Sequence, residues 1–142
     1  MELLIRPFRI EDEPRVIELW QQCDLTRPWN DPHKDIAAKM QVNPELFLVG
    51  EMEGRIIATC MAGYEGHRGW ISYFGVDPAM RRNGIGRRLI EEVEQLLKSR
   101  GCPKINLQIR TSNTAVIKFY ETLGYKLDDV VSMGKRIDTA QK

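Results

Sequence analysis

Residues 73–90, "YFGVDPAMRRNGIGRRLI", decide the fold, because two kinds of secondary structure meet there. The residues up to Val76 complete the run "GWISYFGV", whose aromatic and β-branched side chains predict a strand over Gly69–Val76. From Leu89 onward, apolar residues recur at helical spacing and predict an amphipathic helix. Between them lies the turn "RRNGIG", Arg81–Gly86. The order of strand, glycine-rich turn and helix is typical of a phosphate site.

The chemistry of this turn suits an anion. The first N–H groups of a helix have no intrahelical partner, and the helix dipole favours negative charge there. Gly84 and Gly86 carry no side chain that would keep a phosphate from the backbone. The surrounding positive charge comes from Arg81, Arg82, Arg87 and Arg88. On its own, the pattern is more typical of a structural turn in a solvated basic face than of a ligand site.

Two better-known phosphate motifs do not match. A P-loop requires Gly-Lys followed by Ser or Thr, which the chain lacks. A dinucleotide-binding fingerprint requires a third Gly or Ala where Leu89 stands. The remaining pattern is Arg-x-x-Gly-x-Gly, read from Arg81.

The rest of the chain supplies the other elements of one α/β unit. Asp12 with Pro14, and Asp31 with Pro32, are helix-start signals, and "EG" at Glu53–Gly54 indicates a hairpin. The predicted strands are 3–8, 45–52, 55–64, 69–76, 104–109 and 125–137, and the predicted helices are 12–23, 31–42, 87–100 and 113–124. The order is βααβββαβαβ, which predicts a mixed, mostly antiparallel sheet in a single domain over residues 1–142.

Composition excludes several function classes. The chain has 142 residues and a formal net charge of +1, so we expect neither nucleic acid nor membrane as a partner. Cys23, Cys60 and Cys102 are far apart, and with two histidines they predict neither a disulfide framework nor a metal site. The N-terminus lacks the pattern of a signal peptide. We therefore expect a cytoplasmic protein.

A second group of residues follows the turn. The stretch "NTAVIKFYETLGY" places Asn113 at a helix start and Tyr120 seven residues later. Residues seven apart lie on nearly the same helix face, so both side chains are expected to point the same way.

Together, "YFGVDPAMRRNGIGRRLI" and "NTAVIKFYETLGY" resemble the GCN5-related N-acetyltransferase (GNAT) superfamily. The stretches "CDLTRPWNDP", "GYEGHRG" and "RGCPKINLQI" are similar to its small bacterial acetyltransferases. The resemblance implies a three-layer fold with splayed central strands. It also implies transfer of an acetyl group from acetyl-CoA to a primary amine of a small molecule or peptide, and it leaves a homodimer open. The alternative is an acyl-CoA-binding sensor or interaction module with little catalysis.

The resemblance also assigns roles to residues. Backbone groups of Phe74 and Val76 would pair with the pantetheine arm at a bulge, and the Val76 N–H would polarise the thioester carbonyl. Asn113 would bond the pantetheine region, and Tyr120 would protonate the departing thiolate. The pyrophosphate would be held by the motif that starts at Arg81, through the amides of Arg82, Asn83, Gly84, Ile85, Gly86 and Arg87. Tyr120 could instead be an amphipathic core residue.

The general base is where the pattern departs from the family. Relatives that acetylate protein N-termini carry a Glu five positions before the Asn, where this chain has Gln108. Glu65 and His67, in the loop "YEGHRG", are the alternative candidates, and a solvated turn is the competing interpretation.

The segment between the first two helices is expected to recognise the acceptor. Arg27, Trp29 and Asn30 offer a cation, an aromatic wall and an amide, and Arg27 would suit an acidic substrate. A linker that packs Trp29 inward is equally compatible with the sequence.

Overall fold

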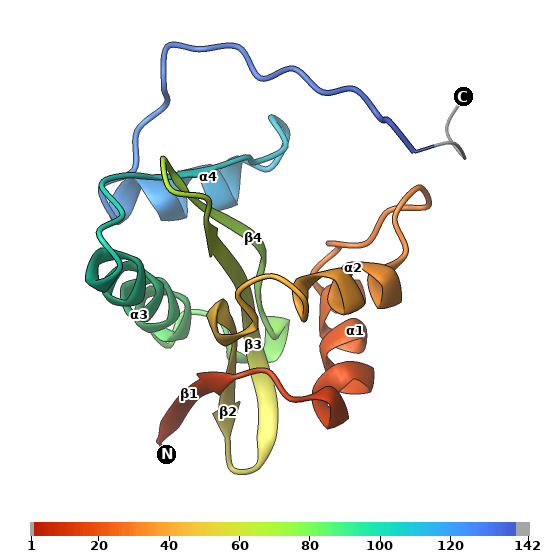
Figure 1. Cartoon of the computed structure of the whole chain (residues 1–142). Helices are drawn as coiled ribbons and strands as arrows, with labels where there is room; N and C mark the ends of the chain where they lie inside the picture. Colours follow the sequence, from red (N-terminus) through yellow and green to blue (C-terminus); the bar gives the residue numbers. More distant parts are fainter. Residues whose placement is uncertain (1, 139–142) are drawn as a thin grey trace. The chain divides into compact units, whose positions relative to one another are not determined.

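The structure, a computed structural model shown in Figure 1, describes residues 2–138. They form two compact units, the first ending at Gln108 and the second beginning at Ile109. The single domain over 1–142 stays a prediction.

The first unit is built on a five-stranded sheet with the order β1-β2-β3-β4-β5. All neighbouring strands are antiparallel except β4 and β5, which are parallel. The strands are β1 (Leu3–Pro7), β2 (Phe47–Met52), β3 (Arg55–Tyr64), β4 (Gly69–Val76) and β5 (Ile105–Leu107). The helices are α1 (Glu13–Gln22), α2 (Pro32–Lys39) and α3 (Ile85–Ser99), with single 3-10 turns at Ile10–Asp12, Pro44–Leu46 and Pro78–Met80.

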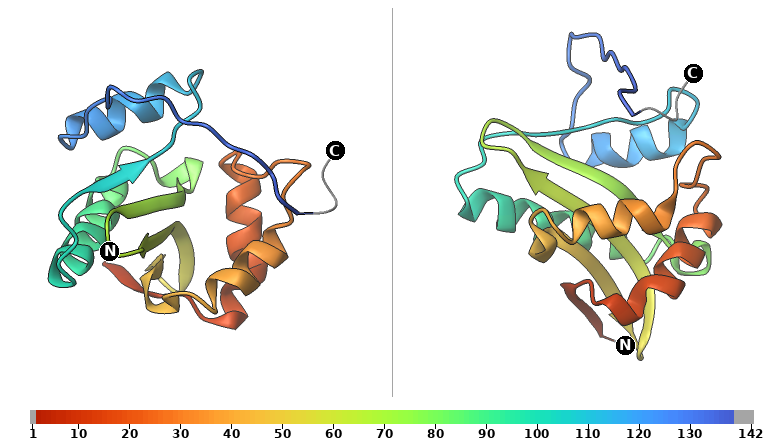
Figure 2. Two further views of the ribbon diagram at one scale, coloured as in Figure 1. Left: turned by 45° about the horizontal axis from the view of Figure 1, so that its top comes forward. Right: turned by 45° about the vertical axis from the view of Figure 1, so that its right-hand side comes forward.

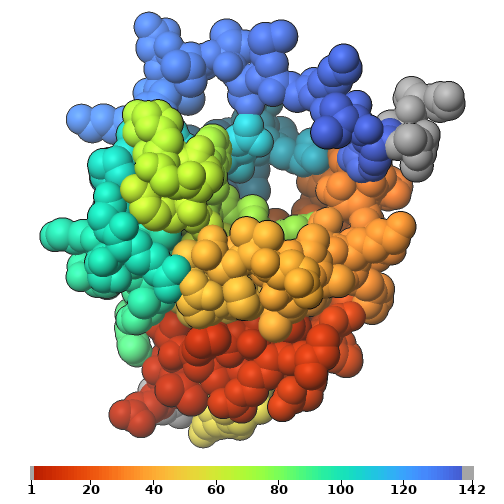
Figure 3. Space-filling model, in the orientation of Figure 1, coloured from red at the N-terminus to blue at the C-terminus, as the bar shows by residue number. Residues whose placement is uncertain are grey.

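Helices cover both faces of this sheet. Figure 2 shows α1 and α2 on one side of the strands and α3 on the other, so the first unit has the expected three layers. In the space-filling view of Figure 3, the red N-terminal segment and the orange segment that leads into β2 pack closely against each other.

Two apolar clusters fill the space between the layers. On the α1 side, the Phe47 ring stacks on Phe8 with centroids 4.4 Å apart and lies near the fully buried Trp20. On the other side, the stripe predicted for α3 is buried through Leu89, Ile90, Val93 and Leu97. The helical spacing of these residues explains why α3 forms and which face it turns inward.

Local signals also placed the hairpin and two helix starts correctly. Glu53 and Gly54 both have positive φ, 52° and 77°, which is the geometry of a tight two-residue β-turn. The Asp31 carboxylate accepts from the His33 N–H at 2.9 Å and caps α2. Asp12 stands at the start of α1, but its carboxylate accepts from the Arg9 N–H and from Arg6, and so fastens the preceding turn to β1.

A bulge interrupts β4 near its end. Thr59 of β3 pairs with Gly75, but Met61 pairs with Ser72, so Tyr73 and Phe74 face the single residue Cys60. Tyr73 takes a positive φ of 50°, which is uncommon for a residue with a side chain. On the other edge, β4 pairs with β5 only over Gly69–Ile71. The rest of β4 has no strand beside it on that edge within the first unit, which is the expected splay.

Over its described residues, 109–138, the second unit contains one helix, α4 (Thr114–Thr122). Its predicted boundaries are confirmed, because Asn113 is the N-cap and Gly124 follows the helix with φ 95°. The strand predicted over 125–137 is wrong, since no strand follows α4 among the described residues. Its apolar side chains are exposed instead of lying on a buried face, as at Leu127, Val131 and Met133.

Across residues 2–138, no helix is both long and apolar enough to span a bilayer. Within the same residues, no three His, Cys, Asp or Glu side chains are grouped as metal ligands would be.

Candidate active site

The glycine-rich turn leads directly into α3. Gly84 is the N-cap with a φ of 73°, and a Cβ added there would meet no atom within 4 Å, so the approach to its backbone is open. The first intrahelical bond is from the Arg88 N–H to the Gly84 oxygen, at 3.1 Å. The amides of Ile85, Gly86 and Arg87 therefore have no carbonyl partner within the helix. These amides form a cradle that fits a phosphate.

The arginines around the cradle are not equivalent. Arg82 has a φ of 69° and is exposed. Arg87 lies 3.9 Å from Glu91, a loose pair between two exposed groups. Arg81, in contrast, donates from Nε to the Val76 oxygen at 3.1 Å. Arg81 therefore ties the turn to the end of β4, whereas Arg82 and Arg87 carry the charge available to an anion.

The backbone of Val76 faces away from β3. Val76 lies opposite Ala58, and the Asp77 N–H donates to the Ile57 oxygen at 2.8 Å. In an antiparallel ladder, a bond between these flanking residues means that Val76 and Ala58 stand opposite each other without bonding to each other. The N–H and C=O groups of Val76 therefore point away from β3. The Val76 N–H therefore points toward the open edge of β4, as its expected role at a thioester requires.

The Val76 oxygen is already occupied. It accepts from Arg81 Nε and also from the Cys23 thiol, at 3.3 Å. Burial raises the pKa of Cys23 and outweighs the opposing effect of Arg81, so the thiol stays protonated and donates. The N–H of Val76 is therefore available to pantetheine, whereas the Val76 oxygen already accepts from two protein donors.

Asp77 fixes the segment between β4 and the cradle. Its Oδ1 accepts from the Ala79 N–H at 3.0 Å, and its Oδ2 accepts from Arg15 of α1 at 2.8 Å. Sequence reasoning did not find the contacts of Arg15 with Asp77 or of Cys23 with Val76, because the paired residues lie 62 and 53 positions apart and leave no local pattern.

The candidate base Glu65 has a structural task. Its Oε1 accepts from the N–H groups of both His67 and Arg68, each at 2.6 Å, in the turn between β3 and β4. The backbone bonds from Arg68 and then His67 lower the pKa of this fully exposed carboxylate. A lowered pKa makes Glu65 a weaker proton acceptor, so the geometry favours the solvated-turn interpretation.

In the loop that was expected to recognise the acceptor, Trp29 is exposed, but the Arg27 side chain is bound within the loop. Arg27 turns back on its own loop and donates to the backbone oxygens of Asp24 and Thr26. Trp29 is 51% exposed and so is not packed inward. Asn30 donates its backbone N–H to the Arg27 oxygen at 3.0 Å.

Asn113 and Tyr120 belong to the second unit. Asn113 Oδ1 accepts from the Val116 N–H at 3.3 Å, and its Nδ2 group is a donor that a pantetheine carbonyl could use. The Tyr120 ring makes edge contacts with Phe119 and Tyr125. Their roles at the cofactor stay predictions.

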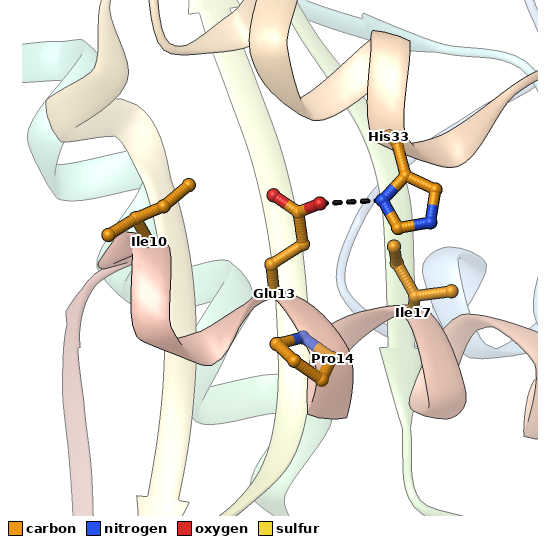
Figure 4. A pocket seen from close by; sticks show the side chains of 5 residues that line it. All are labelled: Ile10, Glu13, Pro14, Ile17 and His33. Carbon is orange, nitrogen blue, oxygen red and sulfur yellow. Dashed lines mark hydrogen bonds and ion pairs between the residues drawn. The ribbon is translucent and has the colours of Figure 1, made fainter.

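A separate cavity of about 430 Å³ lies at the other end of α1 from Cys23. Figure 4 shows it lined by Ile10, Glu13, Pro14, Ile17 and His33. His33 Nδ1 lies 2.6 Å from Glu13 Oε2. None of these residues takes part in the cradle.

Comparisons with known proteins agree with this geometry. The model of the acetyltransferase (GNAT) family matches residues 11–125. An acetyltransferase of Pectobacterium atrosepticum is 50% identical over 133 residues, which cover 94% of each chain.

Two solved structures add to this. The ribosomal-protein-S18-alanine N-acetyltransferase of Escherichia coli is 26% identical, with a TM-score of 0.73 over 87% of this chain and 77% of that one. AAC(6')-Iy, solved with the bisubstrate analog CoA-S-monomethyl-acetylneamine, is 19% identical and shares the fold, with a TM-score of 0.78 over 96% of this chain and all of the other. The chain with the open cradle at α3 therefore belongs to the GNAT family and is an acetyl-CoA-dependent N-acetyltransferase.

Proposed function

We propose that the protein transfers the acetyl group to a primary amine by direct attack of the amine on the thioester. The cradle of Ile85, Gly86 and Arg87 amides holds the pyrophosphate, with charge from Arg82 and Arg87. The observation that carries the proposal is the pairing of this cradle with the outward-facing Val76 N–H, because Arg81, in the turn that leads to the cradle, donates to the Val76 oxygen and so ties that turn to the end of β4.

The local structure fits the cosubstrate. No side chain caps α3, so its first amides are available to phosphate oxygens. The missing strand beside the end of β4 leaves room for an extended arm that pairs with the strand edge. The Val76 N–H then donates to the carbonyl oxygen as negative charge develops on it.

Attack by a neutral amine requires no covalent enzyme intermediate. The nitrogen forms a bond to the acetyl carbon, the carbon–sulfur bond breaks, and the thiolate takes a proton. Tyr120 is proposed as the donor of that proton. The cysteines are not needed as nucleophiles, and burial raises the pKa of Cys60 to about 12.

Two measurements test the proposal. Acetyl-CoA at about 100 times its Kd should stabilise the fold by about 2.7 kcal/mol in thermal melts. Tyr120→Phe should then lower kcat for thiol release with a panel of primary amines and free N-terminal peptides by about 100-fold, without changing acetyl-CoA binding. Tyr125→Phe, a neighbouring tyrosine in the same unit, is the matched control and should keep its kcat.

The two results are separable. Absence of stabilisation by acetyl-CoA would reject the cradle. Stabilisation with full turnover in Tyr120→Phe would keep the cradle and remove the acid role from Tyr120.

A further inference from the structure

Two side chains that are far apart in sequence meet beside the β4 bulge. The Tyr73 hydroxyl donates to Asp35 Oδ2 of α2 at 2.5 Å. The Tyr73 ring also stacks on Trp20 of α1, with centroids 3.8 Å apart and planes 12° from parallel. Three elements thus converge on the residue whose positive φ forms the bulge.

The Asp35 carboxylate is fixed by the Tyr73 hydroxyl, but no cationic side chain among the described residues pairs with it. Burial and then the Asp35 contact raise the pKa of the Tyr73 phenol, so it remains a proton donor. Lys39, one helical turn further along α2, donates instead to the Ala62 oxygen at 2.5 Å. Among residues 2–138, Asp35 Oδ1 has no donor, and the side chain is only half-buried. A carboxylate with one oxygen fixed and the other open is suited to a cationic ligand.

The stack beneath this carboxylate has an unused donor of its own. The Trp20 side chain is fully buried, and its Nε1 has no acceptor among the described residues. Buried polar groups in proteins are normally paired, so this donor, in the ring that stacks on Tyr73, marks a polar position that the described residues leave unsatisfied.

The position of Asp35 relative to β4 indicates which cation it meets. Met61 pairs with Ser72 and Thr59 with Gly75, and Tyr73 between them packs on the α1 and α2 face. The Val76 backbone, three residues on, faces the open strand edge. Asp35 is separated from the strand backbone by a whole tyrosine side chain. An acceptor amine at the strand would thus leave room for a second group to extend to Asp35.

We propose that Asp35, positioned by Tyr73, is a subsite for a second cationic group of the acceptor, so that the enzyme selects amines carrying an additional ammonium or guanidinium group. The inference rests on the proposed function, because it presumes that the acceptor reaches the thioester along β4. It differs from the expectation that Arg27 selects an acidic substrate, since Arg27 is bound to its own loop.

Three amines with similar carbon chains test this directly. Each carries a primary amine at one end of its chain. The other end is an ammonium group in 1,4-diaminobutane, a methyl group in butylamine and a carboxylate group in 4-aminobutanoate. We expect the diamine to have a KM about tenfold below that of butylamine, as one charge-assisted hydrogen bond provides, and the amino acid to have the highest KM of the three.

Asp35→Asn should raise the KM for the diamine about tenfold and leave both kcat and the KM for butylamine unchanged. The asparagine oxygen can still accept from the Tyr73 hydroxyl, so the fold is preserved. Tyr73→Phe should raise the diamine KM by a smaller factor, because the carboxylate keeps its charge but loses its positioning bond. Glu92→Gln, an exposed carboxylate on α3, is the matched control and should change neither KM.

Binding of the three amines to the CoA-loaded and the free protein, measured by calorimetry, provides a readout besides turnover. An equal affinity for the diamine and butylamine, no binding of any of the three, or an unchanged diamine KM in Asp35→Asn would overturn the subsite. Each of these outcomes leaves acetyl-CoA binding and thiol release as separate measurements of the proposed function.

Discussion

At the scale of single residues, the end of β4 is defined by a close approach to α1. A Cβ added at Gly75 would lie 2.9 Å from Cys23 Sγ and 3.1 Å from Leu25 Cδ1. The thiol is held there by its bond to the Val76 oxygen. Gly75 is therefore required by space and not by its φ angle, which is not positive.

Gly75→Ala should destabilise the fold by about 1–3 kcal/mol, because the added methyl overpacks a filled contact. Cys23→Ala in the same chain removes the nearest atom and should recover most of that loss. The measurement is a double-mutant cycle of unfolding free energies. Additive effects of the two substitutions would contradict the contact.

At the scale of elements, the sequence predicted what local patterns determine. The stripe of α3, the cap at Asp31 and the turn at Gly54 depend on residues within a few positions of one another, and the structure confirms them. The pair of Asp35 and Tyr73 joins residues that become neighbours only when α2 packs on β4. The hydrophobic periodicity of a sequence carries no information about such a contact, so the pair of Asp35 and Tyr73 could not be predicted.

The connection between α1 and the cradle predicts a pH dependence. The bond from Ala79, and then Arg15, lower the pKa of the buried Asp77 below its ordinary value of 3.8. A carboxylate whose folded pKa is lowered adds stability above its unfolded pKa, and that stability is lost as pH falls through the folded pKa. Asp77→Asn should therefore cost about 1–3 kcal/mol at neutral pH and progressively less below about pH 4.

Glu18→Gln is the matched control for Asp77→Asn. Glu18 pairs with the same Arg15, but its side chain is 58% exposed. An exposed pair contributes little, so this variant should change stability by less than about 0.5 kcal/mol. Denaturant unfolding at several pH values measures the free energy of unfolding of both variants. A loss of stability in Asp77→Asn that does not change with pH would contradict a charged Asp77 in the folded protein.

At the scale of the whole molecule, the chain divides into a sheet-based unit and a second unit, in whose described part the nine-residue α4 is the one helix. Helices of this length are marginal without packing. The strand prediction for 125–137 failed for a physical reason. The apolar residues of this segment are of the kind found in strands, but a strand forms only where the edge of another strand is available for pairing. That depends on the whole molecule and not on the segment.

Hydrogen exchange with and without acetyl-CoA tests how the second unit takes part. If Tyr120 and Asn113 act at the cofactor, acetyl-CoA should slow exchange both in Arg82–Arg88 and in α4. The β2–β3 hairpin provides the internal reference and should not change. Protection confined to Arg82–Arg88 would leave the cradle in place and exclude α4 from the site.

The contact between Gly75 and Cys23 also restricts how this protein can diverge during evolution. A larger residue at position 75 is tolerable only if position 23 has already become smaller. The reverse order passes through a strained intermediate, whereas a smaller residue at position 23 loses only the thiol bond to Val76. Substitutions at the two sites should therefore be inherited as a correlated pair, with the change at 23 preceding the change at 75.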